Sequence, residues 1–579
     1  MYSYAIEPVV VTATRTEIRA DQVLASVDVV SGEELLRLPA ADLGDVLRMR
    51  AGIEVARLGG PGQQTSLFLR GTESNHVLVL VDGVRINPGT IGSAAIQNIA
   101  PELIERVEIV KGPRSTLYGS DALGGVINII TRRGIANGAS VQAGAGSYDT
   151  RSASVSAGVG GIRGDASFGV AWLDSEGFPT RSGDTADRGY DNLSLTAAAR
   201  TTFAGVELDL RAWHASGTSE YSDFFVTPVD QDFENSAFAL TAGLAPAEIW
   251  ESRLMLAHAL DEIEQNQAPD FLRTRRWQLD WQNDIALSEA HTLTAGLVWQ
   301  DESADAESFG LPYDAATRTT QTYLQDQASF GPHRLLFAAA HTDHETFGDH
   351  VTWNAEYGLE IGAHALLRLA AGTAFRAPDA TDRYGFGGNA DLDPEQSLSY
   401  ELGYRQGIGE RHSVSLTLFR NEIDDLIQFV ITDFTTFDGE NRNVERARID
   451  GLEAAWRYDG ELWAARATLT LQDPRDRMTE APLLRRAQEH ATLGVSRRLG
   501  AHEFAADLLY AGDRRDFGFP APVTMPAYWL ANLSARVAIN ERWTMLARME
   551  NLLDEDYELA RGFNTMGRSL FVAVRHTFR

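Results

Sequence analysis

The chain contains no cysteine, a single lysine and no long apolar run. Without cysteine it has no disulfide, no thiolate metal site and no cysteine nucleophile. No apolar run approaches the roughly 18 residues that a transmembrane helix needs, so helices that span a membrane are excluded. The strands of a membrane β-barrel alternate in polarity and give no such run, so a barrel remains possible.

The charge balance excludes one class of partner. The net charge is -30, and nucleic-acid phosphates demand a basic surface, so we expect no nucleic-acid partner. The length of 579 residues exceeds one ordinary soluble domain. The first residues lack the basic start and apolar core of a secretory signal, so we expect a mature form with a replaced start.

Residues 1–134 mix short apolar strands with helical stretches, which indicates a compact α+β domain. Ser31 precedes two acidic residues, as at a capped helix start, and residues 41–49 carry apolar side chains at helical spacing. The predicted strands lie at residues 9–12, 27–30, 67–69, 77–80, 108–110 and 126–130.

From about Gly138 onward, segments of about ten residues alternate in polarity and are separated by turns or acidic loops. In one of them Phe168, Val170 and Trp172 share a face opposite mostly small residues. A soluble β-sandwich alternates in the same way, but it uses far less chain than this. The pattern therefore favours a large barrel with an apolar outer face.

One segment carries the most information: Val107 to Ile130, VEIVKGPRSTLYGSDALGGVINII, in which a strand, a Gly-Pro turn, a Gly-rich corner and a second strand follow one another. Together with the strand and turn of residues 77–86, it resembles the plug of TonB-dependent outer-membrane receptors. The resemblance implies a 22-stranded antiparallel transmembrane β-barrel at residues 135–579. An N-terminal α+β plug domain, with a TonB box, would occupy residues 1–134. It also implies a place in the bacterial outer membrane and contact with its lipid.

The N-terminal segment resembles the TonB box. Its residues are Glu7, Pro8, Val9, Val10, Val11, Thr12 and Ala13, mostly strong strand formers. Such a peptide binds by adding a strand to a sheet edge of the periplasmic partner TonB, which acts with an inner-membrane energising complex. The alternative is a plain edge strand of the plug.

Charged residues lie within or beside the apolar strands of the plug. Arg70, Arg85, Lys111 and Arg114 are the clearest. A plug in a hydrated lumen needs a polar surface, so we expect these side chains to pair with barrel charges and to hold the architecture rather than a ligand.

Two loop motifs suggest the cargo. Residues 375–378 (FRAP) and 384–395 (YGFGGNADLDPE) resemble a paired motif of the family. The first half of the second motif is closest to cobalamin receptors, and residues 379–389 contain no histidine of the kind that haem transporters use. The resemblance thus implies uptake of cobalamin or a related corrinoid, with a siderophore or haem as the alternative.

Gly-rich stretches at two plug apices are the candidate ligand contacts. Gln63, Gln64 and Thr65 are suited to hydrogen bonds with the amide rim of a corrin, and Thr90 and Ile91 to contact with its face. The alternative is that both stretches are only flexible turns.

The resemblance also implies calcium in external loops. Candidate ligands are Asp187, Asp191, Asp223, Asp230 and Asp232, with Asp184 nearby. Arg188 stands where an acid is expected, and solvated acidic loops are the alternative. No other cofactor is implied, and a surface lipoprotein partner is left open.

No catalytic constellation is visible, and the family resemblance implies a transporter and not an enzyme. Residues 119–124 lack the Gly-x-Ser-x-Gly frame of a nucleophile elbow, and no two histidines have zinc-ligand spacing beside a general base. A passive porin or an adhesion protein is the rival from another class, but a porin has no need of residues 1–134.

Overall fold

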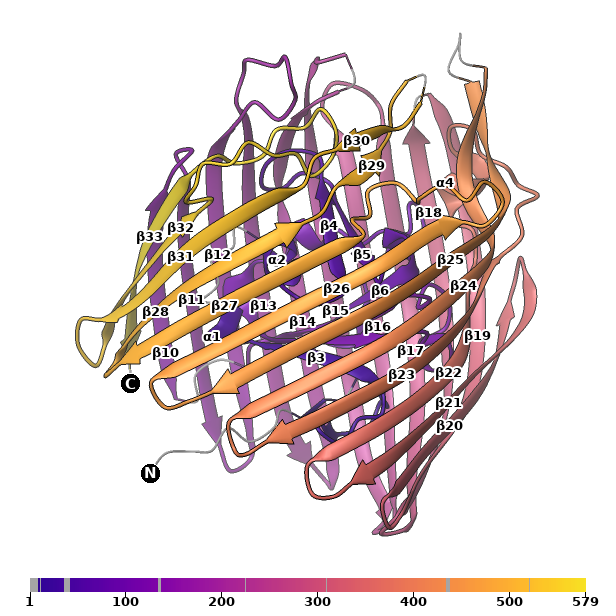
Figure 1. The fold of residues 1–579 in the computed structure, drawn as a ribbon. Helices are drawn as coiled ribbons and strands as arrows, with labels where there is room; N and C mark the ends of the chain where they lie inside the picture. Colours follow the sequence, from indigo (N-terminus) through magenta and orange to yellow (C-terminus); the bar gives the residue numbers. More distant parts are fainter. Residues whose placement is uncertain are drawn as a thin grey trace.

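The structure is a computed structural model, and it describes residues 9–10, 12–35, 42–133, 137–223, 225–308, 310–433, 438–519 and 521–578. Two parts are nested: a closed barrel and a smaller domain inside its lumen (Figure 1). No helix among these residues is long and apolar enough to cross a membrane.

The barrel consists of 22 antiparallel strands, as predicted. It closes where the first strand pairs with the last, with Ala139 opposite Phe578. The strands are β10 (Gly138–Gly146), β11 (Arg151–Gly161), β12 (Gly164–Phe178), β13 (Arg188–Phe203), β14 (Val206–Ser222), β15 (Pro228–Ala247), β16 (Trp250–Gln265), β17 (Phe271–Ser288), β18 (His291–Ser308), β19 (Leu311–Phe330), β20 (His333–His344), β21 (Gly348–Ile361), β22 (Ala365–Arg376), β23 (Glu395–Ile408), β24 (His412–Asp433), β25 (Asp438–Asp459), β26 (Trp463–Asp476), β27 (Glu489–Leu499), β28 (His502–Ala511), β31 (Tyr528–Ala538), β32 (Trp543–Glu550) and β33 (Ser569–Phe578).

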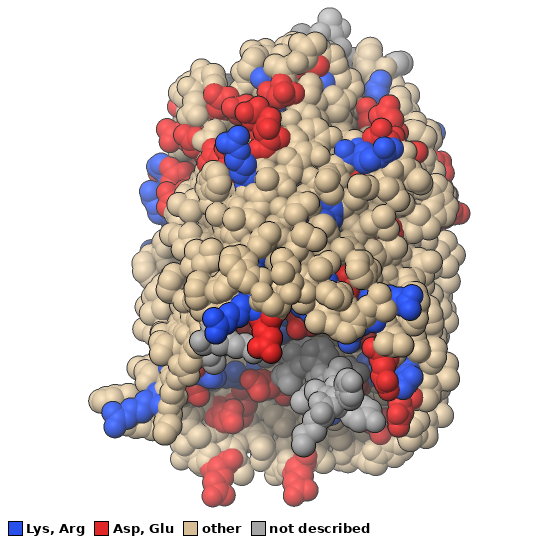
Figure 2. Space-filling view, turned by 90° about the vertical axis from the view of Figure 1, so that its left-hand side faces the viewer, with Lys and Arg blue, Asp and Glu red and all other residues tan. Residues whose placement is uncertain are grey.

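The outer face of the barrel is apolar in its middle. Phe168 and Trp172 of β12 point outward with 53% and 40% of their surface exposed, whereas Ala171 between them is buried toward the lumen. Figure 2 shows a broad belt with few charged side chains, and charges gathered toward both ends. Trp250, Trp463 and Trp543 begin their strands directly after short turns, where aromatic side chains favour a membrane interface.

The two ends of the barrel differ. At one end tight turns join the strands, for example between β19 and β20 (Figure 1). At the other end long loops carry the short helix α4 (Ala380–Tyr384) and the hairpin of β29 (Arg514–Asp516) and β30 (Val523–Met525). This asymmetry assigns the tight turns to the periplasm and the long loops to the outside.

The plug is built on a five-stranded sheet with the order β3-β8-β9-β6-β7. Its apolar runs match the predicted strands, and its helices begin near Ser31, whose Oγ accepts a hydrogen bond from Glu34 N, and at Asp42, which caps α2. The sheet strands are β3 (Ser26–Ser31), β8 (Ile104–Lys111), β9 (Gly125–Thr131), β6 (Val77–Val81) and β7 (Val84–Arg85). The other elements are β1 (Val9–Val10), β2 (Ile18–Arg19), α1 (Gly32–Leu35), α2 (Leu43–Leu47), β4 (Ile53–Arg57), β5 (Thr65–Leu69) and α3 (Ser115–Tyr118), with 3-10 turns at Ser74–His76, Ile96–Asn98 and Pro101–Leu103.

Charged plug side chains are anchored on the barrel wall. Arg70 Nε and Lys111 Nζ both lie 3.0 Å from the carboxylate of Glu453 on β25. Arg114 lies 2.7 Å from Glu356 on β21. These contacts agree with the expectation that plug charges pair with barrel charges, whereas Arg85 pairs with Asp121 of the plug itself.

Candidate functional site

A polar cavity lies between the plug and the barrel wall on the outer side. Its volume is about 90 Å³, enough for several water molecules. The plug contributes the turns at residues 85–92 and 118–121, and the barrel contributes β17 to β20 and β22 together with the loop that carries α4. The side chains that line the cavity include Arg85, Tyr118, Asp121, Arg276, Val298, Gln300, Glu302, Gln321, His344, Phe347, Arg376, Arg383 and Tyr384.

Three of the cavity arginines are neutralised by acids. Arg85 pairs with Asp121, and Arg276 pairs with Glu302. Arg376 is almost completely buried and lies 2.5 Å from Glu395. These guanidinium groups are therefore engaged by acids of the protein itself.

Arg383 differs from the other three. Its guanidinium lies over the rings of Phe347 and Tyr384, with 5.1 and 4.6 Å from Cζ to the ring centroids. Within the part of the chain that the structure describes, its side chain has no ion pair, and its buried Nε has no hydrogen-bond partner. Arg383 thus offers a positive charge and open donors at the edge of the cavity.

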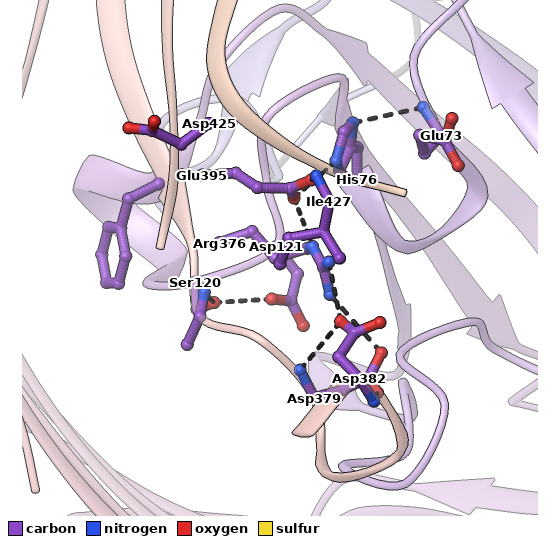
Figure 3. A network of polar contacts seen from close by, with 12 residues as sticks. Glu73, His76, Ser120, Asp121, Arg376, Asp379, Asp382, Glu395, Asp425 and Ile427 are labelled. Carbon is purple, nitrogen blue, oxygen red and sulfur yellow. Dashed lines mark hydrogen bonds and ion pairs between the residues drawn. The ribbon is translucent and has the colours of Figure 1, made fainter. Parts of the chain in front are cut away.

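A buried polar network joins the loop of α4 to the plug (Figure 3). Glu395 Oε2 accepts from Arg376 and lies 2.8 Å from His76 Nε2 of the plug, and its Oε1 accepts from Ile427 N at 2.7 Å. The other guanidinium nitrogens of Arg376 reach Asp382 at 2.9 Å and Asp379 at 3.4 Å. Side chains from the plug, two strands and an outer loop therefore share one set of charges.

Two acids of this network compete for the same positive charge. Burial, and then repulsion by Asp382, raise the pKa of Asp379 well above its ordinary value. Asp379 also caps α4, because its Oδ1 accepts from Asp382 N at 2.8 Å. The start of α4 is therefore tied electrostatically to Arg376.

The end of the predicted TonB box and the residues after it lie inside the lumen. Both the backbone N and the Oγ1 of Thr12 donate to Glu108 of the plug, at 3.0 and 2.7 Å. Further along, Gln325 donates to Thr14 O at 2.9 Å and Gln282 to Arg15 O at 3.0 Å. Barrel side chains thus hold this segment through its backbone carbonyls.

Two family models cover most of the chain. The model described as "TonB dependent receptor-like, beta-barrel" matches residues 137–552, and the "TonB-dependent Receptor Plug Domain" matches residues 19–126. The chain belongs to the TonB-dependent receptor family. Its family and fold are those of outer-membrane TonB-dependent transporters rather than of enzymes, and the family implies TonB as a partner.

Solved receptors share the fold of this receptor. The siderophore receptor PirA from Acinetobacter baumannii is 17% identical, with a TM-score of 0.83 over 97% of this chain and 100% of that chain. The ferripyoverdine receptor of Pseudomonas aeruginosa is 16% identical, with a TM-score of 0.83 over 99% and 89%. A ferric enterobactin receptor mutant of the same organism is 15% identical, with a TM-score of 0.83 over 95% and 99%.

The predicted ligand residues fall in two places of the receptor. Gln63 and Thr65 are buried, and Gln63 Nε2 donates to Glu220 O at 2.6 Å; only Gln64 of this apex is exposed. Thr90 is fully buried and its N donates to Thr274, while Ile91 is half-buried. The second apex borders the cavity through Pro88, Gly89 and Gly92.

Most of the predicted calcium ligands have protein partners of their own in the receptor. Asp184 pairs with Arg188 at 2.9 Å, and Asp223 caps the backbone of its own turn. Asp230 accepts from Gln267 and Asp232 from Thr218, Asp191 stands opposite Asp174 in the sheet, and Asp187 is exposed. Among the described residues no group of three or more His, Asp or Glu side chains is arranged for a metal. Calcium stays a prediction.

The TonB-box residues are partly covered by the structure. Glu7, Pro8 and Val11 lie outside the described residues. Val9 and Val10 pair with Arg19 and Ile18 of β2, while Thr12 and Ala13 are buried. The sequence did not single out Arg383, His76 or Glu395 as site residues. Arg383 lies between the motifs at residues 375–378 and 384–395, and Glu395, the partner of His76, is the last residue of the second motif.

Proposed function

We propose that this receptor imports a bulky, anionic metal chelate of the ferric siderophore class across the outer membrane. The observation that carries this proposal is Arg383, a guanidinium with no ion pair among the described residues and with two aromatic faces beneath it. Guanidinium groups donate in pairs to carboxylate and catecholate-type oxygens, and aromatic rings accept the flat faces of such ligands. The siderophore receptors of the same fold support this cargo class.

The size of the cavity sets where the cargo binds. A volume of about 90 Å³ admits only part of such a ligand. We therefore place the cargo at the outer mouth, against Arg383, Tyr384 and the apex at residues 88–92, with the plug closing the lumen beneath it.

The second candidate is cobalamin, which the motif at residues 384–395 favours. The absence of histidine from residues 379–389 speaks against haem ligation in that loop. His344 does line the cavity, however, and its Nδ1 accepts from Thr346 and Phe347 N at 3.3 Å. Haemin is therefore a necessary third probe.

The predicted domain boundaries assign a separate role to each of the two domains. We propose that residues 1–134 comprise the TonB box and plug and that residues 135–579 form the barrel. The box, residues 7–13, would pair as an added strand with TonB, whose pull displaces part of the plug.

The test is a binding titration of the purified receptor with ferric enterobactin, cyanocobalamin and haemin. We expect ferric enterobactin to bind, and Arg383→Gln to weaken it by about tenfold to a hundredfold, the range for a hydrogen bond to a charged group. Arg318→Gln is the matched control, because Arg318 is exposed and pairs with Asp301 in an outer segment. Binding of cyanocobalamin alone would replace the first candidate by the second.

A further inference from the structure

An aromatic side chain of the plug, Tyr118, forms part of the floor of the outer cavity. Tyr118 lines the cavity, and its hydroxyl donates to Thr12 O at 3.0 Å on the opposite side. Gln321 of β19 lines the cavity beside it and holds α3 by donating to Ser115 O at 2.7 Å. The ring of Tyr118 therefore lies between the cavity and Thr12 of the predicted TonB box.

Below this floor a stack of side chains closes the lumen against the wall. The guanidinium of Arg15 lies between Tyr118 and Tyr323, 4.6 and 5.1 Å from the ring centroids, and 2.6 Å from Asp280. Tyr323 reaches across the wall because β18 has Gly296 opposite it; a Cβ there would stand 2.3 Å from the ring. The constriction is thus built from one plug ring, one barrel ring and Arg15.

The wall behind this stack is polar above and below it. Inward-facing residues of β17, β18 and β19 form successive rows, set by the strand register: Gln278, Gln300 and Thr319; Asp280, Val298 and Gln321; Gln282, Gly296 and Tyr323; Asp284, Thr294 and Gln325. From Gln321 to Gln327 the strand covers about 20 Å. Amide and hydroxyl groups therefore line the lumen from the cavity toward the periplasm.

Residues 12–16 cover the lower part of this wall. The hydrogen bonds from Gln325, Gln282 and Gln327 to the N-terminal part of the chain reach this segment and not the plug sheet. Gln325, Gln282 and Gln327 donate to Thr14 O, Arg15 O and Thr16 Oγ1. These amides already bind two backbone carbonyls and one side-chain hydroxyl, so they are suited to bind the amides, hydroxyls or carbonyls of a passing ligand instead. Withdrawal of the segment would expose them in sequence.

We propose that β17, β18 and β19 form the translocation path, a transit site for amide- and hydroxyl-rich cargo, and that Tyr118 gates it while Arg15 lies beneath its ring. This inference rests on the proposed TonB-dependent import. Because Thr12 and Ala13 end the predicted box and residues 14–16 directly follow it, traction on the box removes Thr12 and Arg15 first. Tyr118 then loses its hydrogen bond and its cation–π contact, and the cavity opens downward.

A competing route exists along the opposite wall. Small cavities lie between the plug and β31–β32, one lined by Asn532 and Gly60 and one by Ser534 and Glu102. That wall is covered by the plug domain itself, through Asp45, Arg48 and Arg57. Opening it requires displacement of buried ion pairs of the plug, so we place the path on the other side.

The absence of cysteine makes a labelling test clean. Gln325→Cys and Gln327→Cys report on the proposed path, and Ser534→Cys, a nearly isosteric change, reports on the opposite wall. Cells are treated from outside with a membrane-impermeant maleimide too large for porins, with and without TonB, in the presence of ferric enterobactin or cyanocobalamin. Surface level and heat-modifiable migration verify the folded barrel.

We expect labelling of the two path cysteines only in cells with TonB. Tyr118→Ala should raise the labelling of Gln325→Cys about tenfold even without TonB, from loss of the cation–π contact and one hydrogen bond. Tyr118→Phe keeps the ring and loses only the hydrogen bond, so its labelling should fall between that of the wild type and that of Tyr118→Ala. Labelling of Ser534→Cys in place of the path cysteines, or no effect of Tyr118→Ala, would overturn the path while leaving TonB-dependent uptake intact. No TonB-dependent uptake of any probe would instead refute the proposed function.

Discussion

The buried carboxylate of Glu453 should be a main anchor of the plug. It accepts from Arg70 Nε at 3.0 Å, from Arg70 Nη2 at 3.3 Å and from Lys111 Nζ at 3.0 Å. All three side chains are at most 6% exposed. Glu453→Gln keeps the shape of the side chain and removes its charge, which leaves two buried cations facing a neutral amide.

The magnitude follows from the partners that remain. Removal of one member of a buried pair costs about 3–5 kcal/mol. Arg70 keeps Glu401 at 2.8 Å, and Lys111 keeps Ala51 O at 2.6 Å, so we expect the lower end of that range. About 3 kcal/mol corresponds to an opening equilibrium of the plug that is on the order of 100-fold larger.

Amide hydrogen exchange of β8 and β9 measures this opening, because both strands lie in the plug sheet and β8 carries Lys111. Lys111→Met in the Glu453→Gln background should restore part of the protection, since it removes a buried unpaired charge. Glu461→Gln is the control; its partner Arg411 is exposed, and such pairs contribute little. Unchanged amide hydrogen exchange in Glu453→Gln, or no rescue by Lys111→Met, would show that Glu453 does not anchor the plug.

Three further predictions concern the box, pH and calcium. Val10→Pro removes a backbone donor and fixes φ, so strand addition to TonB and uptake should stop while ligand binding is retained; normal uptake would contradict the box assignment. Burial raises the pKa of Glu54 in the plug to about 7. The contribution of Glu54 to plug stability is therefore fully present below about pH 4.5 and is lost as the pH rises through about 7. Glu54→Gln should flatten the pH dependence of amide hydrogen exchange in the plug between these pH values, and an unchanged pH dependence would contradict this prediction. If Asp187, Asp191, Asp223, Asp230 and Asp232 bind calcium, ligand affinity should rise by a typical coupling of about 5- to 150-fold over that in chelator, whereas equal affinities would make these acids a solvated rim.

The barrel was predictable from sequence because alternation is local. The face shared by Phe168 and Trp172 needs only period-two spacing, and the plug strands needed only short apolar runs between glycines. The number of strands came from the family resemblance of the plug motif, since alternation alone does not count strands.

The site was less predictable because its contacts join distant residues. His76 and Glu395 are 319 positions apart, and Tyr118 and Thr12 are 106 apart. Which side chains meet depends on the register of the whole barrel and on how the plug is turned inside it. The apex residue Gln63 was expected to contact ligand, yet it donates to a barrel backbone carbonyl that no sequence pattern reveals.

Import by the receptor is proposed to be active and to depend on TonB. Its most direct test is the uptake rate of labelled ferric enterobactin and labelled cyanocobalamin in cells that express this receptor, with TonB and without it. One cargo should accumulate only when TonB is present, and this accumulation should be lost when the proton gradient is collapsed. Equal uptake in both strains would identify a passive pore and contradict the account.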